Sequence, residues 1–185
     1  SAASDVYKRQ ALGGSAYEGV DGSTPVALPA AQKIAVDDHT YDSGSGDVGL
    51  TIGKLIHAKN KLDAAETDEM AKRYCVVTAD QISDLLTTTE VTSADYNNVK
   101  ALVNGEVNTF MGFEFVRTER LLTSGGDRLI YCYTDTAIGC GVPKDINVDI
   151  GPRRDKRNST QVYACQSIGA TRVEDVQVVE VACNI

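Results

Sequence analysis

The order of predicted elements between residues 50 and 121 constrains the fold more than any other feature of this chain. Leu55 and Leu62 belong to an apolar stripe at helical spacing, which predicts an amphipathic helix of about four turns. The apolar run Arg73–Val77 then predicts a short buried strand, and two capped helices precede a further strand at 111–117. Helices and strands that alternate in this way favour a mixed α+β domain.

Capping residues mark where these helices begin and end. Thr78 and Gln81 fit a capping box, in which the Gln81 side chain reaches back to the backbone amide of Thr78. Ser93 is the expected N-cap of the next helix, and Gly105 stands where a left-handed residue ends it. Gly53 would cost about 1 kcal/mol relative to alanine in a helix interior, so we expect it in the first turn.

The first helix also carries polar side chains whose placement the pattern predicts. Lys54, Lys61 and Asp63 lie off the apolar stripe and are expected on other, solvent-facing sides. His57 lies near the stripe, and we interpret it as a histidine with a structural hydrogen bond rather than a ligand.

Composition limits the class of protein. With 185 residues, 42% of them hydrophobic, the chain is long enough for one domain, or for one domain with an appendage. No apolar stretch approaches the roughly 20 residues that a membrane span needs, so no membrane partner is predicted. The net charge of −8 argues against a protein that wraps nucleic acid with a basic surface.

Side chains that could perform catalysis or bind metal are scattered along the chain. The cysteines are not spaced C-x-x-C, which argues against a zinc site and favours small buried side chains: Cys75, Cys132, Cys140, Cys165 and Cys183. The segment Gly139–Gly141 lacks the third glycine of a dinucleotide fingerprint, so no cofactor is predicted. The enzymatic alternative is a Cys75–His57 dyad, in which the histidine would activate the thiol.

The first 49 residues read differently from the rest. Residues 1–10 resemble read-through of a sequencing adaptor, and we expect them to lie outside the fold. Residues 11–49 are rich in glycine and predict an exposed, extended arm or loop, with either a linker or a functional role. Val26, Leu28 and Ile34 are its exposed apolar side chains and candidate contacts with another subunit.

The chain after residue 121 is rich in predicted strands. Beyond a basic loop at 151–158, residues 161–168 and 176–183 are predicted to pair with each other, giving three helices and six or seven strands in total. Three interpretations of this loop remain open. It is solvated, it contacts an acidic surface of a neighbouring copy such as Glu66–Glu69, or it contacts DNA. Its cationic side chains are Arg153, Arg154, Lys156 and Arg157.

Several segments together resemble one family of major capsid proteins of tailed bacteriophages. The resemblance covers about residues 25–185 and is carried by the order and spacing of these segments rather than by a catalytic signature. The segments are Leu50–Lys59, Arg73–Leu86, Thr92–Gly105, Phe110–Arg117, Thr160–Ala164, Ile168–Arg172 and Val178–Val181.

The resemblance implies the Hong Kong 97-type capsid fold. Residues 11–49 would supply the extended loop across a neighbouring subunit, and residues 50–72 the long spine helix of a peripheral domain. Residues 73–150 would form the axial domain, and residues 151–185 the basic loop and the strands that return to the peripheral domain. The usual N-terminal arm would be missing, as in a truncated environmental fragment.

The resemblance also implies a function, which is assembly into a virion shell. The partners would be copies of the chain in pentamers and hexamers, with scaffold and portal proteins and packaged double-stranded DNA bound without sequence preference. Assembly would take place in the host cytoplasm, with no cofactor and no catalytic residue. The alternatives are an encapsulin-like compartment shell of the same fold and, from a different class, a Cys/His enzyme.

Overall fold

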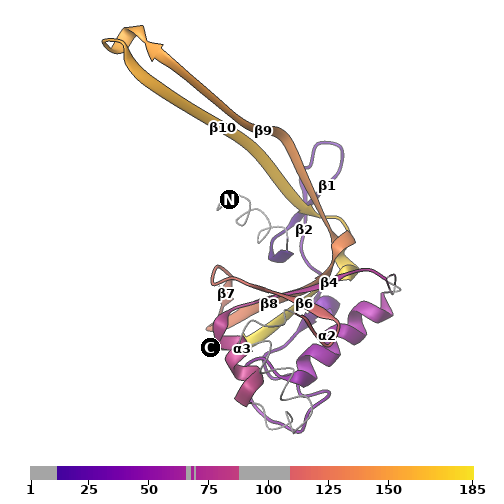
Figure 1. Cartoon of the computed structure of the whole chain (residues 1–185). Helices are drawn as coiled ribbons and strands as arrows, with labels where there is room; N and C mark the ends of the chain where they lie inside the picture. The colour runs from indigo at the N-terminus through magenta and orange to yellow at the C-terminus, as the bar shows by residue number, and fades with distance from the viewer. Residues whose placement is uncertain (1–11, 66–67, 69, 88–108) are drawn as a thin grey trace.

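A computed structural model of the chain describes residues 12–65, 68, 70–87 and 109–185. The predicted helix Ser93–Gly105 and the adaptor-like residues 1–10 lie outside this part of the chain. Figure 1 shows a body of helices and short strands and one long hairpin that projects from it. The elements are β1 (Ala16–Glu18), β2 (Thr24–Val26), β3 (Lys33–Ile34), α2 (Ile52–Ala64), β4 (Arg73–Val77), α3 (Ala79–Thr87), β5 (Thr109–Phe110), β6 (Phe113–Arg117), β7 (Thr123–Ser124), β8 (Asp127–Thr134), β9 (Ile138–Arg153), β10 (Ser159–Arg172) and β11 (Val178–Asn184).

The body is built on a seven-stranded mixed sheet in the order β3-β11-β8-β4-β6-β5, with β7 paired to β8. The β11–β3 and β4–β6 pairs are parallel, and the other pairs are antiparallel. Helices and strands therefore share one domain, which confirms the mixed α+β prediction. The core includes side chains with no exposed surface from five elements: Leu55, Val77, Phe113, Ile130 and Val181.

Helix α2 has 13 residues, close to the four turns that the apolar stripe predicts, but one of its side chains does not lie where we expected. Thr51 is the N-cap, and its hydroxyl accepts a hydrogen bond from the Lys54 amide over 3.2 Å. Leu55, Ala58 and Leu62 are buried, and the helix packs on β11 and β3. The prediction of a solvent-facing Lys54 is wrong, because this side chain is fully buried.

Lys54 is buried without an ion pair because backbone carbonyls surround its ammonium group. Its Nζ donates to the carbonyl oxygens of Val36, Val48 and Ala182 over 2.8–2.9 Å. Three donors on one ammonium are thereby matched by three acceptors. Burial nevertheless lowers the pKa of Lys54 from its usual value.

Tight turns set the register of the hairpins in the body. Phe110 pairs with Phe113 across Met111 and Gly112, whose φ angles are 53° and 86°. Two consecutive positive φ angles match the right-handed twist of the flanking strands and give a tight entry into β6. At α3, the Thr78 amide donates to Gln81 Oε1 over 3.1 Å, as the capping box predicts.

Most described residues of the segment before α2 are exposed, but two apolar side chains that we predicted to be exposed there are buried. Leu28 and Ile34 are only 6% and 3% exposed and belong to the core. Ile34 lies in β3, which pairs with β11, and Leu28 precedes that strand. They are therefore not available as contacts with another subunit. Val26 is half-buried at the end of β2.

The strands after residue 137 are longer than predicted and pair differently. β10 pairs with β9 in a hairpin, and β11 pairs with β8 and β3, so the predicted pairing of 161–168 with 176–183 is wrong. The reason is the tight tip at 154–158, which returns the chain directly along β9. A domain boundary at residue 150 would fall inside this hairpin.

The structure contains no helix, among the described residues, that is long and apolar enough to cross a membrane.

Candidate assembly surface

The β9–β10 hairpin is the most exposed ordered element of the described chain. β9 has 16 residues and β10 has 14, so at about 3.3 Å per residue the ribbon is roughly 50 Å long. Among the described strands, β9 pairs only with β10 and β10 only with β9, which leaves the outer edge of each strand without a backbone partner. Native proteins seldom leave edges this long uncovered, because such edges pair readily with another chain.

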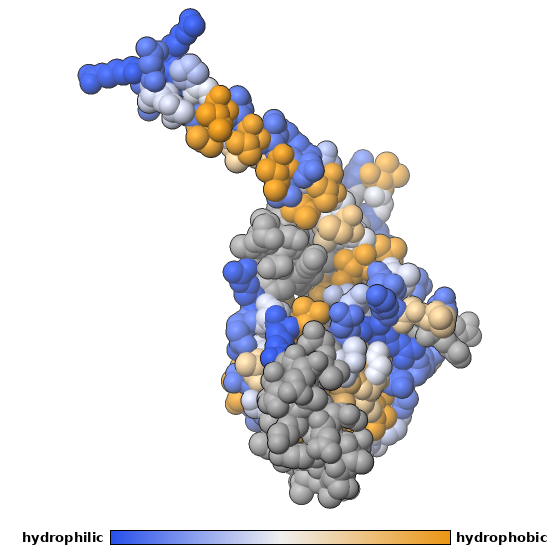
Figure 2. Space-filling model, in the orientation of Figure 1, coloured by the Kyte–Doolittle hydropathy of each residue, from blue (hydrophilic) through white to orange (hydrophobic). Residues whose placement is uncertain are grey.

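One face of the ribbon is apolar. Ile150 lies opposite Val162, and Val148 lies opposite Ala164. Because side chains alternate along a strand, Ile146 extends the same face two residues further. We call these five residues the apolar ribbon face. Figure 2 shows hydrophobic side chains following the projecting hairpin, with hydrophilic residues at its tip.

The apolar ribbon face is open to solvent in the single chain. Ile146, Ile150 and Val162 are 64%, 66% and 65% exposed, and Val148 is 51% exposed. The opposite face carries polar pairs, with Asp149 opposite Tyr163. This amphipathic pattern is typical of a ribbon that buries one face against a partner.

The basic residues predicted from the sequence lie together at the hairpin tip. Arg153 ends β9, and its Nε donates to both carboxylate oxygens of Asp155 over 2.8 and 2.9 Å. Arg154 and Lys156 lie in a single 3-10 turn, and Arg157 adopts a left-handed conformation with φ of 51°. The tip therefore presents four cations and one paired carboxylate.

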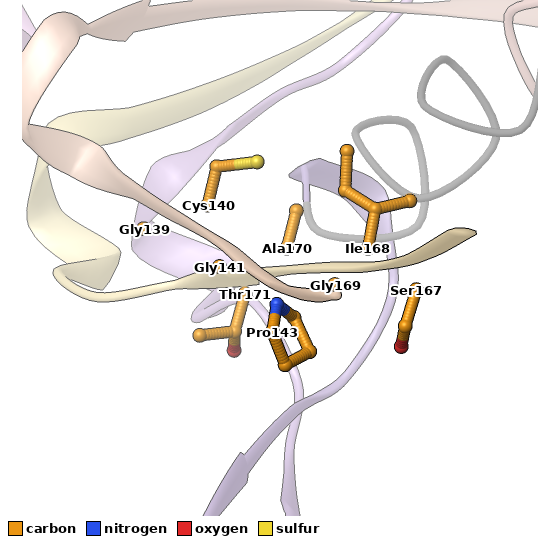
Figure 3. A pocket seen from close by; sticks show the side chains of 9 residues that line it. All are labelled: Gly139, Cys140, Gly141, Pro143, Ser167, Ile168, Gly169, Ala170 and Thr171. Atoms are coloured by element: carbon orange, nitrogen blue, oxygen red, sulfur yellow. The ribbon is translucent and has the colours of Figure 1, made fainter. Parts of the chain in front are cut away.

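A hollow of about 590 Å³ lies at the base of the hairpin, between the first residues of β9 and the last residues of β10. Figure 3 shows the residues that line it, among them Cys140, Pro143 and Thr171. The lining contains no carboxylate, imidazole or amine. The exposed thiol of Cys140 is the one titratable side chain of this lining, and the lining holds no second group that could act as its base.

The residues of the enzymatic alternative have structural partners. His57 Nδ1 lies 2.6 Å from Asp38 Oδ2, and its ring packs edge-on against Tyr41. Cys75 is fully buried with its sulfur 3.4 Å from that of Cys132 on the neighbouring strand. The contact with Cys132, followed by burial, raises the pKa of the Cys75 thiol, which disfavours the thiolate that a nucleophile requires. In the described part of the chain, no group of three or more potential ligands could hold a metal ion.

Sequence reasoning missed the apolar ribbon face. The alternation Ile146, Val148, Ile150 was the available signal, but Pro143, Lys144 and Asp145 interrupt the apolar pattern just before it. A proline in an edge strand removes no internal ladder bond when its nitrogen faces outward, so the strand continues through it.

Comparison with solved structures shows which fold this is. The chain is similar to the capsid of cyanophage Pam1, with a TM-score of 0.63 and 13% identity over 99% of this chain and 64% of that one. It is similar to the capsid of a native GTA particle, with a TM-score of 0.56 and 15% identity over 100% and 63%. A structure from Mycobacterium phage Che8 matches with a TM-score of 0.54 and 21% identity over 69% and 46%. The fold is that of the Hong Kong 97-type capsid proteins of tailed phages.

The family model for phage capsid proteins matches residues 3–185, and the chain therefore belongs to the phage capsid protein family. It spans between 46% and 64% of the length of the three capsid structures above. A comparison with curated proteins finds no match.

Proposed function

We propose that this chain is part of the major structural subunit of a tailed-phage shell, which self-assembles into pentamers and hexamers and encloses the genome. The observation that carries the proposal is the exposed hairpin, whose apolar ribbon face and open edges have no partner within the described chain. A neighbouring copy that covers them is a heterologous contact, which symmetry closes into rings.

The energetics favour an assembly made of many such contacts. Each valine or isoleucine that passes from water into an apolar contact contributes up to about 1.5–3 kcal/mol. The four large side chains of the ribbon face therefore supply enough free energy for a weak pairwise contact, repeated many times in a shell.

Charge supports the same partner. The hairpin tip is basic in a chain whose net charge is −8, so the surface of a second copy attracts it. We propose Arg153, Arg154, Lys156 and Arg157 as a contact with an acidic surface of a neighbouring copy, and Val26 as a minor apolar contact. Scaffold and portal proteins are proposed as further partners, and DNA as a cargo held without sequence preference.

We further propose that the protein has no enzymatic activity and that its shell belongs to a virion assembled in the host cytoplasm. The second candidate is a compartment shell, because an encapsulin complex from Synechococcus elongatus matches with a TM-score of 0.51 and 9% identity. The phage capsid family match favours the virion. The two differ in their contents, since a virion encloses DNA and a compartment encloses a cargo protein.

Sedimentation and negative-stain microscopy of Ile146→Asp test the proposal. Ile185→Asp is the matched control, because Ile146 and Ile185 are each 64% exposed and only Ile146 belongs to the hairpin. We expect the parent chain and the control to form rings or shells, and Ile146→Asp to remain a folded monomer. A parent chain that stays monomeric with or without scaffold protein, or an Ile146→Asp variant that assembles normally, would contradict the proposal.

A further inference from the structure

A buried arginine joins the hairpin to the body. Arg172 is the last residue of β10, and its side chain has no exposed surface. Its Nη1 donates to the carbonyl oxygens of Gly14 and Leu12 over 3.1 and 3.5 Å, and its Nη2 donates to that of Val26 over 3.0 Å. Its Nε donates to Asp175, which begins the turn leading to β11.

These hydrogen bonds connect three segments at the point where the hairpin leaves the body. On the hairpin side, Arg172 pairs with Ile138, the first residue of β9. On the other side lie the carbonyls that flank β1 and β2 and the carboxylate of Asp175. One planar guanidinium thus fixes the base of the hairpin against the N-terminal segment and the start of β11.

The ribbon just beyond Arg172 has little stiffness of its own. Its register shifts twice, between Cys165 and Ser167 and between Ser167 and Gly169. Gly141 and Gly169 face each other across the strands, and a Cβ on either would meet nothing within 4 Å. Packing within the described chain therefore does not require glycine at these positions, and bulges with paired glycines make a ribbon easy to bend.

We infer that Arg172 is a positioning residue that sets the direction in which the β9–β10 hairpin leaves the body. The consequence for assembly rests on the proposed function, because the hairpin direction decides where the apolar ribbon face meets a neighbouring copy. The direction itself is a property of the single chain and is measured without assembly.

The chain supplies a matched control in Lys54. Both cations are fully buried, and each donates to three backbone carbonyl oxygens. Lys54 joins α2 to residues 36 and 48 and to β11, with no contact to the hairpin among these bonds. Removing either charge leaves carbonyls without partners, but only Arg172 lies at the hairpin base.

The test is a single-molecule fluorescence transfer measurement on monomeric chains, with dyes on non-canonical residues at Asn158 in the tip and Asn60 in α2. We expect Arg172→Met to broaden and shift the distance distribution, Arg172→Lys to do so less, and Lys54→Met to leave it at the parent width. Asp175→Asn is the milder variant if Arg172→Met does not fold. Circular dichroism confirms folding in each case.

Two outcomes overturn the inference. One is a folded Arg172→Met chain with the parent distribution. The other is a Lys54→Met chain that broadens as much, which would make the effect one of general stability. Assembly is scored separately: a parent chain that fails to assemble contradicts the proposed function, whereas the distance distributions alone decide the role of Arg172.

Discussion

The body and the hairpin place the same kinds of side chain in opposite surroundings. In β8 and β11, Ile130 and Val181 have no exposed surface, whereas Ile150 and Val162 of the hairpin are 66% and 65% exposed. β8 and β11 have neighbouring strands on both sides, while each strand of the hairpin has one. The body therefore satisfies its own apolar surface, and the hairpin leaves its apolar face for another chain to cover.

This difference separates stability from assembly within one small chain. Substitutions in the body remove contacts that the monomer makes, so they change the free energy of unfolding. If a neighbouring copy covers the ribbon face, as we propose, substitutions there remove contacts that only the neighbour makes, so they should leave the monomer unchanged and change association.

Leu55→Ala and Val162→Ala compare the two regions directly. Leu55 is fully buried in α2, so its truncation should cost about 2–5 kcal/mol of unfolding free energy. Val162 is 65% exposed, so its truncation should stay within about 0.5 kcal/mol of the parent. Urea unfolding measures both free energies when each substitution is combined with Ile146→Asp, which keeps the chain monomeric. Similar losses for the two substitutions would contradict the difference between body and hairpin.

The loop before α2 should make the stability of the body depend on pH. His39 Nε2 donates to the Gly46 carbonyl over 2.9 Å, and Nδ1 lies 2.5 Å from Asp42 Oδ1. Asp42 also accepts from the Thr51 hydroxyl that caps α2. The Gly46 bond, followed by the Asp42 bond, raises the pKa of His39 above its usual 6.5.

A raised folded-state pKa means that protonated His39 favours the folded state. This contribution should be complete below about pH 6.5 and should disappear as the pH rises through the folded-state pKa. Thermal unfolding of the parent and of His39→Gln between pH 5 and 9 measures it. We expect the two curves to converge at the alkaline end, and a constant difference across this range would contradict the assignment.

Gly169→Ala should produce a small gain. Gly169 has extended backbone and open space where the Cβ would lie. Replacing a glycine at such a position reduces the entropy of the unfolded chain and stabilises by about 0.4–1 kcal/mol. Gly126→Ala is the contrasting variant, because a φ of 107° strains any L side chain. A loss of stability in Gly169→Ala would show that the hairpin base needs its glycine.

Reversing charge at the hairpin tip should have the smallest effect on the monomer. The tip is exposed, so Arg154→Glu with Arg157→Glu should leave the unfolding free energy within about 0.5 kcal/mol of the parent. Assembly should weaken, and its dependence on salt should change, because exposed charges are screened. If the yield and the salt dependence of assembly are unchanged, the hairpin tip does not contact a neighbouring copy.

Local signals predicted the body well. The stripe through Leu55 and Leu62, the run Arg73–Val77 and the Thr78–Gln81 box all describe interactions between residues close in sequence. Such interactions depend on spacing alone, so a sequence reports them directly.

The remaining features depend on contacts between distant residues. Lys54 is buried because carbonyls 18, 6 and 128 positions away surround its ammonium group. Ile34 is buried because β3 pairs with β11, which lies at the other end of the chain. No local sequence pattern identifies these distant partners. A glycine-rich segment with scattered apolar residues has the same sequence pattern whether its side chains are exposed or buried.

Hydrogen–deuterium exchange of the subunit and of the assembled particle shows whether a neighbouring copy covers the hairpin. If a neighbouring copy covers the hairpin, backbone amides in residues 144–152 and 160–168 exchange readily in the subunit and become protected in the particle. Amides of β8 and β11 in the body remain protected in both states. Equal exchange of the hairpin amides in subunit and particle would contradict the account, because the hairpin would then lie outside the contacts that build the shell.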